Sequence, residues 1–195
     1  MSVTSDDPVE QFKAWFTEAA EAEPVNPNAM TLATVDAMGR PSARMVLLKD
    51  VDAGGFVFYT NLGSRKATEL QVNPHAALCF YWKTLAKQVR VEGTIEAVSD
   101  AEADAYFATR AKLSQLGAWA SKQSQPLEGR LALEKRVAKY TAQFNFGEVP
   151  RPDFWSGFRL RPMRIELWKE EAFRLHDRTQ YTWDGQDWNI EKLYP

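Results

Sequence analysis

The sequence predicts a mainly β protein, an antiparallel barrel of Greek-key type with flanking helices. Two observations lead to this prediction. Short runs rich in β-branched and aromatic residues follow one another at hairpin spacing, separated by turn residues. Helical segments with recognisable start signals lie between some of these runs. Because strands joined by hairpins pair antiparallel, a closed or partly closed barrel with added helices fits this pattern.

Length and charge limit the classes of function. The chain has 195 residues, enough for one domain with a substantial core, with residues 1–27 as an N-terminal segment and helix and 28–195 as the barrel. Its 24 basic and 26 acidic residues give a net charge of -2, without a basic stripe or an apolar span. We therefore expect no nucleic acid and no membrane as a partner. The single cysteine, Cys79, cannot form an intramolecular disulfide, which favours a cytoplasmic location.

The individual elements are predicted from capping and periodicity. After a polar segment at 1–7, Pro8 suits the first helical position behind Asp7, and Ser99 with Glu102 resembles a capping box. We expect helices from 8 up to the prolines at 24 and 27, from 64 through 70, at 99–110, at 114–120 and at 127–144. We expect strands at 29–35, 42–49, 56–59, 75–82, 88–98, 155–161, 163–168, 172–178, 181–183 and 188–193.

The centre of the chain, 44–66, carries the first functional signal. It predicts two strands, a tight loop and a helix whose N-cap is Ser64. Arg65 and Lys66 fall in the first turn of this helix, where cations oppose the helix macrodipole unless an anion joins them. A phosphate there would gain from free backbone N–H groups and from both side chains. This stretch therefore predicts an anionic ligand between two strands and a helix start.

Spacing indicates that there are two anions. Arg44 and Lys49 are five residues apart, so an ideal strand sends their side chains to opposite faces. Tyr106, Arg110 and Ser114 follow at i, i+4 and i+8, and on a continuous helix they would share one face suited to gripping a phosphate. Alternatively these three residues form an ordinary solvated helix face.

A third cluster lies at 173–178. If this segment is a strand, Arg174, His176 and Arg178 share one face and repel one another unless an anion or water screens them. Histidine is also the side chain best suited to exchange a proton near neutral pH. The alternative is an exposed edge strand protected by charge.

Other chemistries have less support. Gln88, with Gln123 and Ser124, offers neutral donors and acceptors suited to the edge of a heterocycle. The only histidines, His75 and His176, are far apart in sequence, so no familiar metal-ligand spacing occurs and we expect no metal. Phosphate-binding and dinucleotide-binding glycine motifs are also absent from the sequence.

Five motifs in order resemble the pyridoxamine 5'-phosphate oxidase family: RMVLLK, FYTNLGSRK, the Gln88-Val89 pair, GAWASKQS and RLHDR. The resemblance extends from about Asn28 to Pro195. It implies an FMN-binding split barrel and a homodimer with FMN at the subunit interface. It also implies oxidation of pyridoxamine 5'-phosphate or pyridoxine 5'-phosphate to pyridoxal 5'-phosphate. The acceptor would be O2, with release of H2O2 and, from the amine, NH3.

The resemblance also implies roles by position. The residues that would contact FMN are Arg44, Met45, Val46, Leu47, Leu48, Lys49, Tyr59, Thr60, Arg65, Lys66, Gln88, Gln123, Ser124, Trp168 and Arg178. Those that would hold the substrate are Lys49, Tyr106, Arg110, Ser114, Arg174 and His176. Arg174 and His176 would be catalytic, with Arg174 orienting C4' of the substrate for hydride transfer to flavin N5.

Two other functions stay open on the sequence. A different split-barrel FMN oxidoreductase would keep Arg44, Arg65 and Lys66 but would not need the Arg174-x-His176 pair. A non-catalytic carrier of FMN or pyridoxal phosphate would bind its ligand without consuming oxygen.

Overall fold

The computed structural model describes residues 6–195, so the predicted polar segment at 1–7 lies largely outside the described part of the chain. The helices described are α1 (Pro8–Ala22), α2 (Arg65–Val72), α3 (Asp100–Thr109), α4 (Lys112–Ala120) and α5 (Ala132–Gln143), with a 3-10 turn, η1 (Ala172–Arg174). The strands described are β1 (Ala29–Val35), β2 (Pro41–Leu47), β3 (Asp50–Asp52), β4 (Gly55–Asn61), β5 (His75–Trp82), β6 (Lys87–Ala97), β7 (Trp155–Lys169), β8 (Asp177–Trp183) and β9 (Trp188–Lys192).

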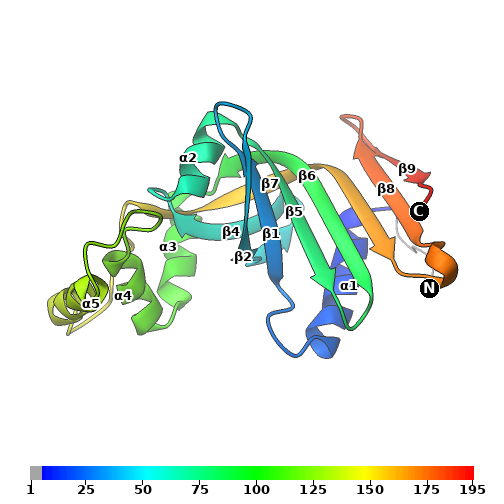
Figure 1. Cartoon of the computed structure of the whole chain (residues 1–195). Coiled ribbons are helices and arrows are strands. Elements are labelled where there is room, and N and C mark those ends of the chain that lie inside the picture. Colours follow the sequence, from blue (N-terminus) through cyan, green and yellow to red (C-terminus); the bar gives the residue numbers. More distant parts are fainter. Residues whose placement is uncertain (1–5) are drawn as a thin grey trace.

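The strands form one curled antiparallel sheet (Figure 1). The order β2-β1-β5-β6-β7-β4-β3 follows the main path, while β8 pairs with β7 and β9 pairs with β8. The long strand β7 therefore pairs with β4 along its first half and with β8 along its second half. This curled sheet with helices around it confirms the predicted fold class, a split barrel of antiparallel strands.

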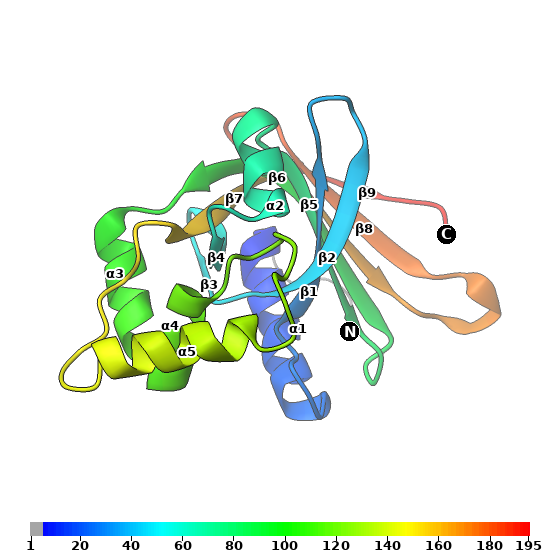
Figure 2. The same ribbon diagram turned by 60° about the vertical axis from the view of Figure 1, so that its left-hand side comes forward.

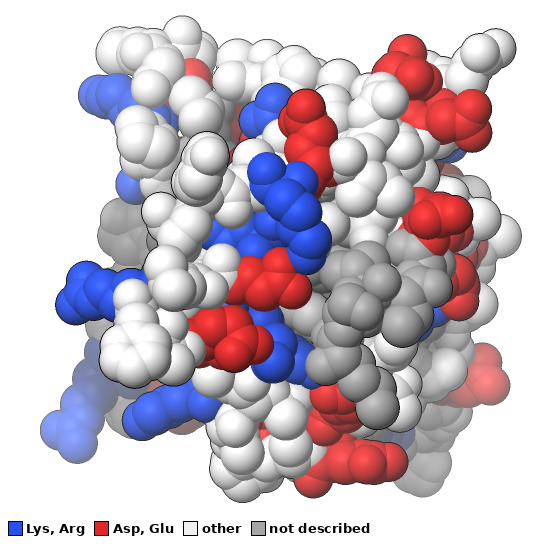
Figure 3. Space-filling view, turned by 90° about the vertical axis from the view of Figure 1, so that its right-hand side faces the viewer, with Lys and Arg blue, Asp and Glu red and all other residues white. Residues whose placement is uncertain are grey.

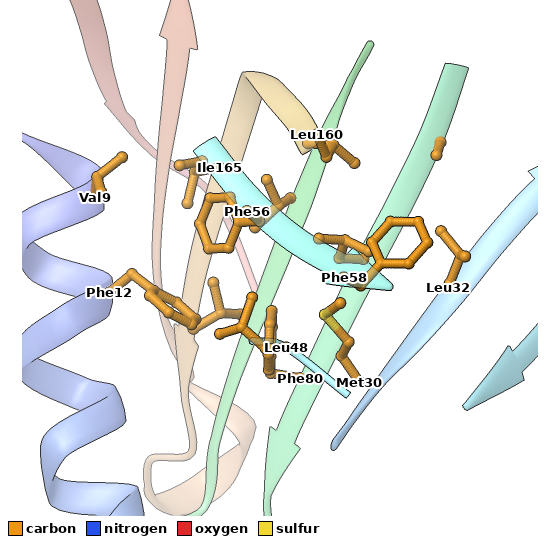
Figure 4. Close-up of a cluster of buried hydrophobic side chains, with 14 of the residues drawn as sticks. Val9, Phe12, Met30, Leu32, Leu48, Phe56, Phe58, Phe80, Leu160 and Ile165 are labelled. Atoms are coloured by element: carbon orange, nitrogen blue, oxygen red, sulfur yellow. The ribbon is translucent and has the colours of Figure 1, made fainter. Parts of the chain in front are cut away.

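The core lies inside the curl and is closed by α1. Phe12 of α1 is fully buried, and its ring contacts Phe56, Phe80 and Trp82 at centroid distances of 4.9, 5.0 and 5.9 Å. Figure 4 shows Phe12 pointing from the helix toward these strands. Burying one such ring stabilises the folded state by about 1.5–3 kcal/mol. The apolar face of α1 therefore contributes substantially to the stability of the fold.

The start signals of the helices are confirmed. The Asp7 side chain accepts a hydrogen bond from the Val9 backbone N–H, and Pro8 opens α1. The Ser99 side chain accepts one from the Glu102 N–H at the start of α3. Ser64 is the N-cap residue of α2, but its side chain makes no capping hydrogen bond.

The C-terminal strands differ from the prediction. The two strands expected at 155–161 and 163–168 are one strand, β7, because a register shift at Glu92/Gly93 of β6 lets Pro162 sit within the ladder. Gly93 permits this close approach, since a Cβ there would lie 1.9 Å from the Arg161 carbonyl oxygen.

One prediction about the candidate clusters is wrong, and the condition attached to another is not met. The helices predicted at 99–110 and 114–120 are α3 and α4, but they do not form the continuous helix on which Tyr106, Arg110 and Ser114 would share one face. The strand expected at 172–178 is instead the turn η1 followed by β8, because Phe173 and Arg174 have φ of 59° and 62°, in the left-handed region. Arg174 and His176 therefore do not share a strand face with Arg178.

The helices α3, α4 and α5 lie together at one end of the molecule, whereas β8 and β9 lie at the other end (Figures 1 and 2). None of the helices in the described part of the chain is long and apolar enough to cross a membrane.

Candidate functional site

A cavity of about 690 Å³ lies where β2, β4 and the start of α2 meet the α3–α4 region. Its walls combine cations, hydroxyls, amides and aromatic rings, which is the chemistry of a site for an anionic ring-bearing ligand. The lining residues are Met45, Val46, Leu47, Lys49, Tyr59, Thr60, Asn61, Lys66, Tyr106, Arg110, Ala111, Ser114, Gly117, Ala118, Ser121, Gln123 and Trp155.

Lys66 is a buried cation in this cavity, with 9% of its surface exposed. Its ammonium donates to Thr60 Oγ1, Ser64 Oγ and Gln123 Oε1 at 3.0, 3.2 and 3.0 Å, all neutral acceptors. Burial, and then the nearby charge of Arg44, lower the pKa of Lys66. An unneutralised buried cation is costly, so the geometry favours an anion beside Lys66.

The start of α2 adds to this preference for an anion. No acidic residue occupies its first turn, and the Ser64 side chain accepts from Lys66 instead of capping the helix. The first backbone N–H groups of a helix lack intrahelical partners and attract negative charge. The backbone and Lys66 therefore favour the same kind of ligand at the same place.

Arg110 is the second cation of the cavity. Its guanidinium carbon lies 4.8 Å from the ring centroid of Trp155 and 5.6 Å from that of Phe107. Its Nη1 is the one buried side-chain N or O atom without a hydrogen-bond partner among the residues described. Burial lowers the pKa of Arg110, although the Coulombic contribution of Tyr106 opposes this. Such an unpaired donor favours an anionic acceptor.

Aromatic side chains form one wall. The Tyr59 and Tyr106 rings are stacked with centroids 4.0 Å apart, and Tyr59 is also stacked on Trp155 at 5.3 Å. Burial raises the pKa of Tyr59 to about 12, so its hydroxyl stays protonated as a donor at neutral pH.

The break between α3 and α4 does not separate the predicted phosphate grip. Tyr106 comes from α3, Arg110 is the C-cap residue of α3, and Ser114 comes from α4, yet all three line the cavity with Lys49. The turn at Arg110–Ala111 thus places residues from two short helices in one cavity.

The residues predicted to contact FMN fall into three groups. Eight line the cavity: Met45, Val46, Leu47, Lys49, Tyr59, Thr60, Lys66 and Gln123. Four neighbours of these do not line it: Arg44, Leu48, Arg65 and Ser124. The remaining three, Gln88, Trp168 and Arg178, lie elsewhere on the sheet.

Gln88, Trp168 and Arg178 are adjacent across three strands, since Gln88 pairs with Trp168 and Trp168 pairs with Arg178. The His176 ring lies 4.8 Å from the Trp168 ring, and η1 places Arg174 just before His176. None of these five residues lines the cavity. We call them the β8 cluster.

The surface around the β8 cluster is balanced in charge. Arg178 Nε donates to Glu166 Oε1 at 2.8 Å, and Arg90 Nη1 donates to Glu166 Oε2 at 3.1 Å. Seen from the side of β8 and β9, basic and acidic side chains lie next to one another (Figure 3). Of the three side chains expected to repel one another, Arg178 is therefore paired with a carboxylate of the same chain.

The sequence prediction missed two important residues. Trp155 was assigned only to a strand, although it stacks on Tyr59 and contacts Arg110. Glu69 was not singled out, although its carboxylate contacts both Arg44 and Arg65. The i, i+4 spacing of Arg65 and Glu69 was a signal for the second contact.

Comparisons with known proteins point to one family. Residues 16–144 match the family model described as "Pyridoxamine 5'-phosphate oxidase", and residues 155–195 match the "Pyridoxine 5'-phosphate oxidase C-terminal dimerisation region". A pyridoxine/pyridoxamine 5'-phosphate oxidase of Brucella anthropi is 58% identical over 193 residues, covering 98% of this chain and 95% of the relative. One of Rhodospirillum rubrum is 58% identical, covering 100% and 99%.

Solved structures show the same fold. PhzG from Burkholderia lata, in complex with tetrahydrophenazine-1-carboxylic acid, superposes with a TM-score of 0.93 at 32% identity, covering 98% of this chain and 94% of that one. An FMN-binding protein of Nostoc punctiforme related to pyridoxamine 5'-phosphate oxidase gives a TM-score of 0.78 at 19% identity, covering 98% and 100%.

The curled antiparallel sheet, with a cation-lined cavity beside it, thus defines a split-barrel enzyme. The chain belongs to the pyridoxamine 5'-phosphate oxidase family.

Proposed function

We propose that this chain oxidises pyridoxamine 5'-phosphate and pyridoxine 5'-phosphate to pyridoxal 5'-phosphate, with FMN as cofactor and O2 as acceptor. One observation carries the proposal: buried Lys66 and half-buried Arg110, two cations without an anionic partner among the described residues, line the same cavity. A phosphorylated cofactor and a phosphorylated substrate would neutralise one cation each. The named relatives support this choice of substrate.

Lys66, Arg65 and the start of α2 would hold the phosphate of FMN. Lys66 has only neutral partners among residues 6–195, and the first turn of α2 offers backbone N–H donors. Met45, Val46 and Leu47 of β2 would line the flavin ring, since they form a continuous wall of the cavity. These residues fit the cofactor because they offer positive charge at one place and apolar surface beside it.

Arg110, Lys49, Tyr106 and Ser114 would hold the substrate phosphate. Arg110 has a donor, Nη1, without an acceptor in the described part of the chain, and Tyr106 and Ser114 add neutral hydroxyl groups. Charge-assisted hydrogen bonds contribute about 1.5–3 kcal/mol each, so a few of them suffice to position a small substrate. This grip fixes C4' of the substrate relative to the cofactor, which supplies much of the rate.

When bound, FMN supplies the redox chemistry by accepting a hydride from C4', and O2 then regenerates it with release of H2O2. Arg174 would orient the substrate ring, and its permanent charge makes an electrostatic role more suitable than that of a free base. His176, whose ring lies beside that of Trp168, would act as the partner of Arg174 over the substrate ring. The amine substrate would release NH3.

The site would be completed by a second copy of the chain. The β8 cluster lies outside the cavity and toward the opposite end of the molecule from α4 and α5 (Figure 1). The match of residues 155–195 to a dimerisation region supports a homodimer. In a two-fold dimer the β8 cluster of one protomer would reach the cavity of the other.

The test combines a spectrum with a substrate series. The purified protein is expected to be yellow, or to become yellow with added FMN, and to consume O2 and form peroxide with pyridoxamine 5'-phosphate and pyridoxine 5'-phosphate. Unphosphorylated pyridoxamine is the matched control and should react far more slowly, because it leaves Arg110 without an acceptor. A protein that binds FMN but consumes no O2 with either phosphate would be a carrier instead. Faster turnover of tetrahydrophenazine-1-carboxylic acid than of either phosphate would identify a different oxidase.

A further inference from the structure

Glu69 in α2 is a buried carboxylate that does not line the cavity and has no part in the proposed reaction. Only 5% of its surface is exposed. Its Oε2 accepts from Thr34 Oγ1 at 2.5 Å and from Ser42 Oγ at 2.7 Å. The same oxygen accepts from Arg44 Nη2 at 3.1 Å, while Oε1 accepts from Arg65 Nε at 2.8 Å. One carboxylate therefore joins β1, β2 and α2.

Glu69 is ionised in the folded protein. Burial by itself would raise its pKa, but hydrogen bonds from Thr34, Ser42, Arg65 and Arg44 lower the pKa of Glu69 to about 2. The negative charge is thus present at every physiological pH.

This charge lies among three cations. Arg44 and Arg65 both contact Glu69, and Arg44 is close enough to Lys66 to lower the pKa of that lysine. Like charges so close together repel one another strongly, above all where they are partly buried. Glu69 offsets part of this repulsion.

Arg44 is also held in one conformation. Its Nη1 donates to the Leu32 carbonyl and Thr34 Oγ1 at 3.0 and 2.6 Å, and its Nη2 donates to Ser42 Oγ at 2.5 Å and to Glu69. Arg65 donates a hydrogen bond from Nε to Glu69, and 64% of its side-chain surface is exposed. The carboxylate therefore fixes the stem of Arg65 while the rest of its guanidinium faces solvent.

We propose that Glu69 is a positioning residue for the phosphate end of the flavin. It ties Arg44 of β2 and Arg65 of α2 to one carboxylate and so holds both guanidinium groups at the first turns of α2, the helix that carries Lys66, before the ligand binds. Preorganised cations lose less side-chain entropy when a phosphate arrives. The inference rests on the proposed binding of FMN, and it assigns to Glu69 an effect on the phosphate alone.

The experiment compares FMN with riboflavin, which lacks the phosphate. The dissociation constants of both flavins for the full-length apoprotein are measured by quenching of flavin fluorescence. The dissociation constant of riboflavin divided by that of FMN reports the contribution of the phosphate to binding. In Glu69→Gln this ratio is expected to fall by about tenfold or more, the equivalent of one charge-assisted hydrogen bond, with riboflavin binding unchanged. A merely structural role would weaken both ligands equally and leave the ratio intact.

Glu18→Gln is the matched control. Glu18 of α1 also pairs with a buried cation, Lys87 of β6, but neither residue lines the cavity. This variant is expected to keep the wild-type ratio. Ser42→Ala, which removes one donor from Glu69 without changing any charge, covers the case that Glu69→Gln fails to fold. Its ratio is expected to fall by about threefold, since it loses the Ser42 hydrogen bonds to Glu69 and Arg44 but keeps every charge and the contacts of Glu69 with both arginines.

The outcomes separate the two proposals. An unchanged or larger ratio in Glu69→Gln overturns the positioning role, because Glu69 would then have no effect on phosphate binding or would repel the phosphate. If only Ser42→Ala folds, the same result in that variant overturns the role. A wild-type protein that binds FMN no better than riboflavin overturns both this inference and the proposed cofactor site.

Discussion

The guanidinium of Arg110 lies over the indole ring of Trp155, with its Cζ atom 4.8 Å from the ring centroid. The two residues are far apart in sequence, and the end of α3 at Thr109 brings them together. A cation over an aromatic face is attracted to it and shielded from water on that side. Arg110 also lines the cavity, and its buried Nη1 has no hydrogen-bond partner among the described residues.

Replacing Arg110 with alanine should raise KM for pyridoxamine 5'-phosphate by about tenfold to a hundredfold, the equivalent of one or two charge-assisted hydrogen bonds. FMN should stay bound. Steady-state kinetics and the flavin content of the purified variant measure both effects. Arg161→Ala, which removes an exposed arginine paired with Glu96, is the control and should leave KM unchanged. Loss of FMN without a change in KM would mean that Arg110 serves the cofactor.

Replacing Lys66 with methionine should separate stability from binding. The variant loses a buried cation that has only neutral partners, so we expect the apoprotein to melt no lower than the wild type and as much as about 2–4 °C higher. The affinity for FMN should fall by at least about tenfold. Thermal unfolding of the apoprotein and a flavin titration test the pair of effects. Lys13→Met, on the exposed side of α1, should alter neither. A lower melting temperature together with unchanged FMN binding would contradict this reading of Lys66.

Gly157 on β7 should be required for the aromatic wall. A Cβ at this position would lie 2.7 Å from two ring atoms of Tyr59, so Gly157→Ala must displace that ring. Since Tyr59 stacks on Tyr106, the substrate grip should loosen and KM should rise by about threefold to tenfold, the equivalent of about one aromatic pair. Gly129→Ala, where a Cβ meets no atom within 4 Å, is the matched control. Wild-type kinetics in Gly157→Ala would show that the wall is not needed.

The contribution of Glu69 to stability should depend on pH. Its pKa is lowered from the usual 4.5 to about 2 in the folded protein, so ionised Glu69 stabilises the fold fully above pH 4.5. This stabilisation is lost as the pH falls from 4.5 toward 2. The difference in unfolding free energy between the wild type and Glu69→Gln should therefore be larger at pH 7 than at pH 3. Urea unfolding at both values measures it, and an equal difference at both would contradict the assignment.

Mixed dimers should test whether the site is shared. At a substrate concentration well below KM, the Arg174→Ala and Arg110→Ala homodimers should each show little activity. After subunit exchange between them, one site in each heterodimer would combine an intact cavity with an intact β8 cluster, giving about a quarter of wild-type activity after random mixing. Mixing Lys66→Met with Arg110→Ala, both from the cavity, is the control and should restore no comparable activity, because each heterodimer site then carries one altered cavity. Failure of both mixtures would place Arg174 and Arg110 in the same protomer's site.

Local signals in the sequence were sufficient for most elements. The start of α1 follows from Asp7 and Pro8, and the strand expected at 75–82 is β5 itself. Capping hydrogen bonds and alternating burial are properties of a few neighbouring residues, so a sequence displays them directly. The strand predicted at 172–178 failed because two left-handed residues, which no local pattern marks, interrupt it.

By itself the sequence determined that cations occur where a helix starts and that a second group of phosphate-binding side chains follows 40 or more residues later. Only the tertiary structure decided which of them meet. Lys66 contacts Gln123 across 57 residues of chain, and Glu69 contacts Thr34 across 35. Such contacts follow from how the sheet curls and how α2 and α4 pack against it, and packing is a property of the whole chain rather than of any short stretch.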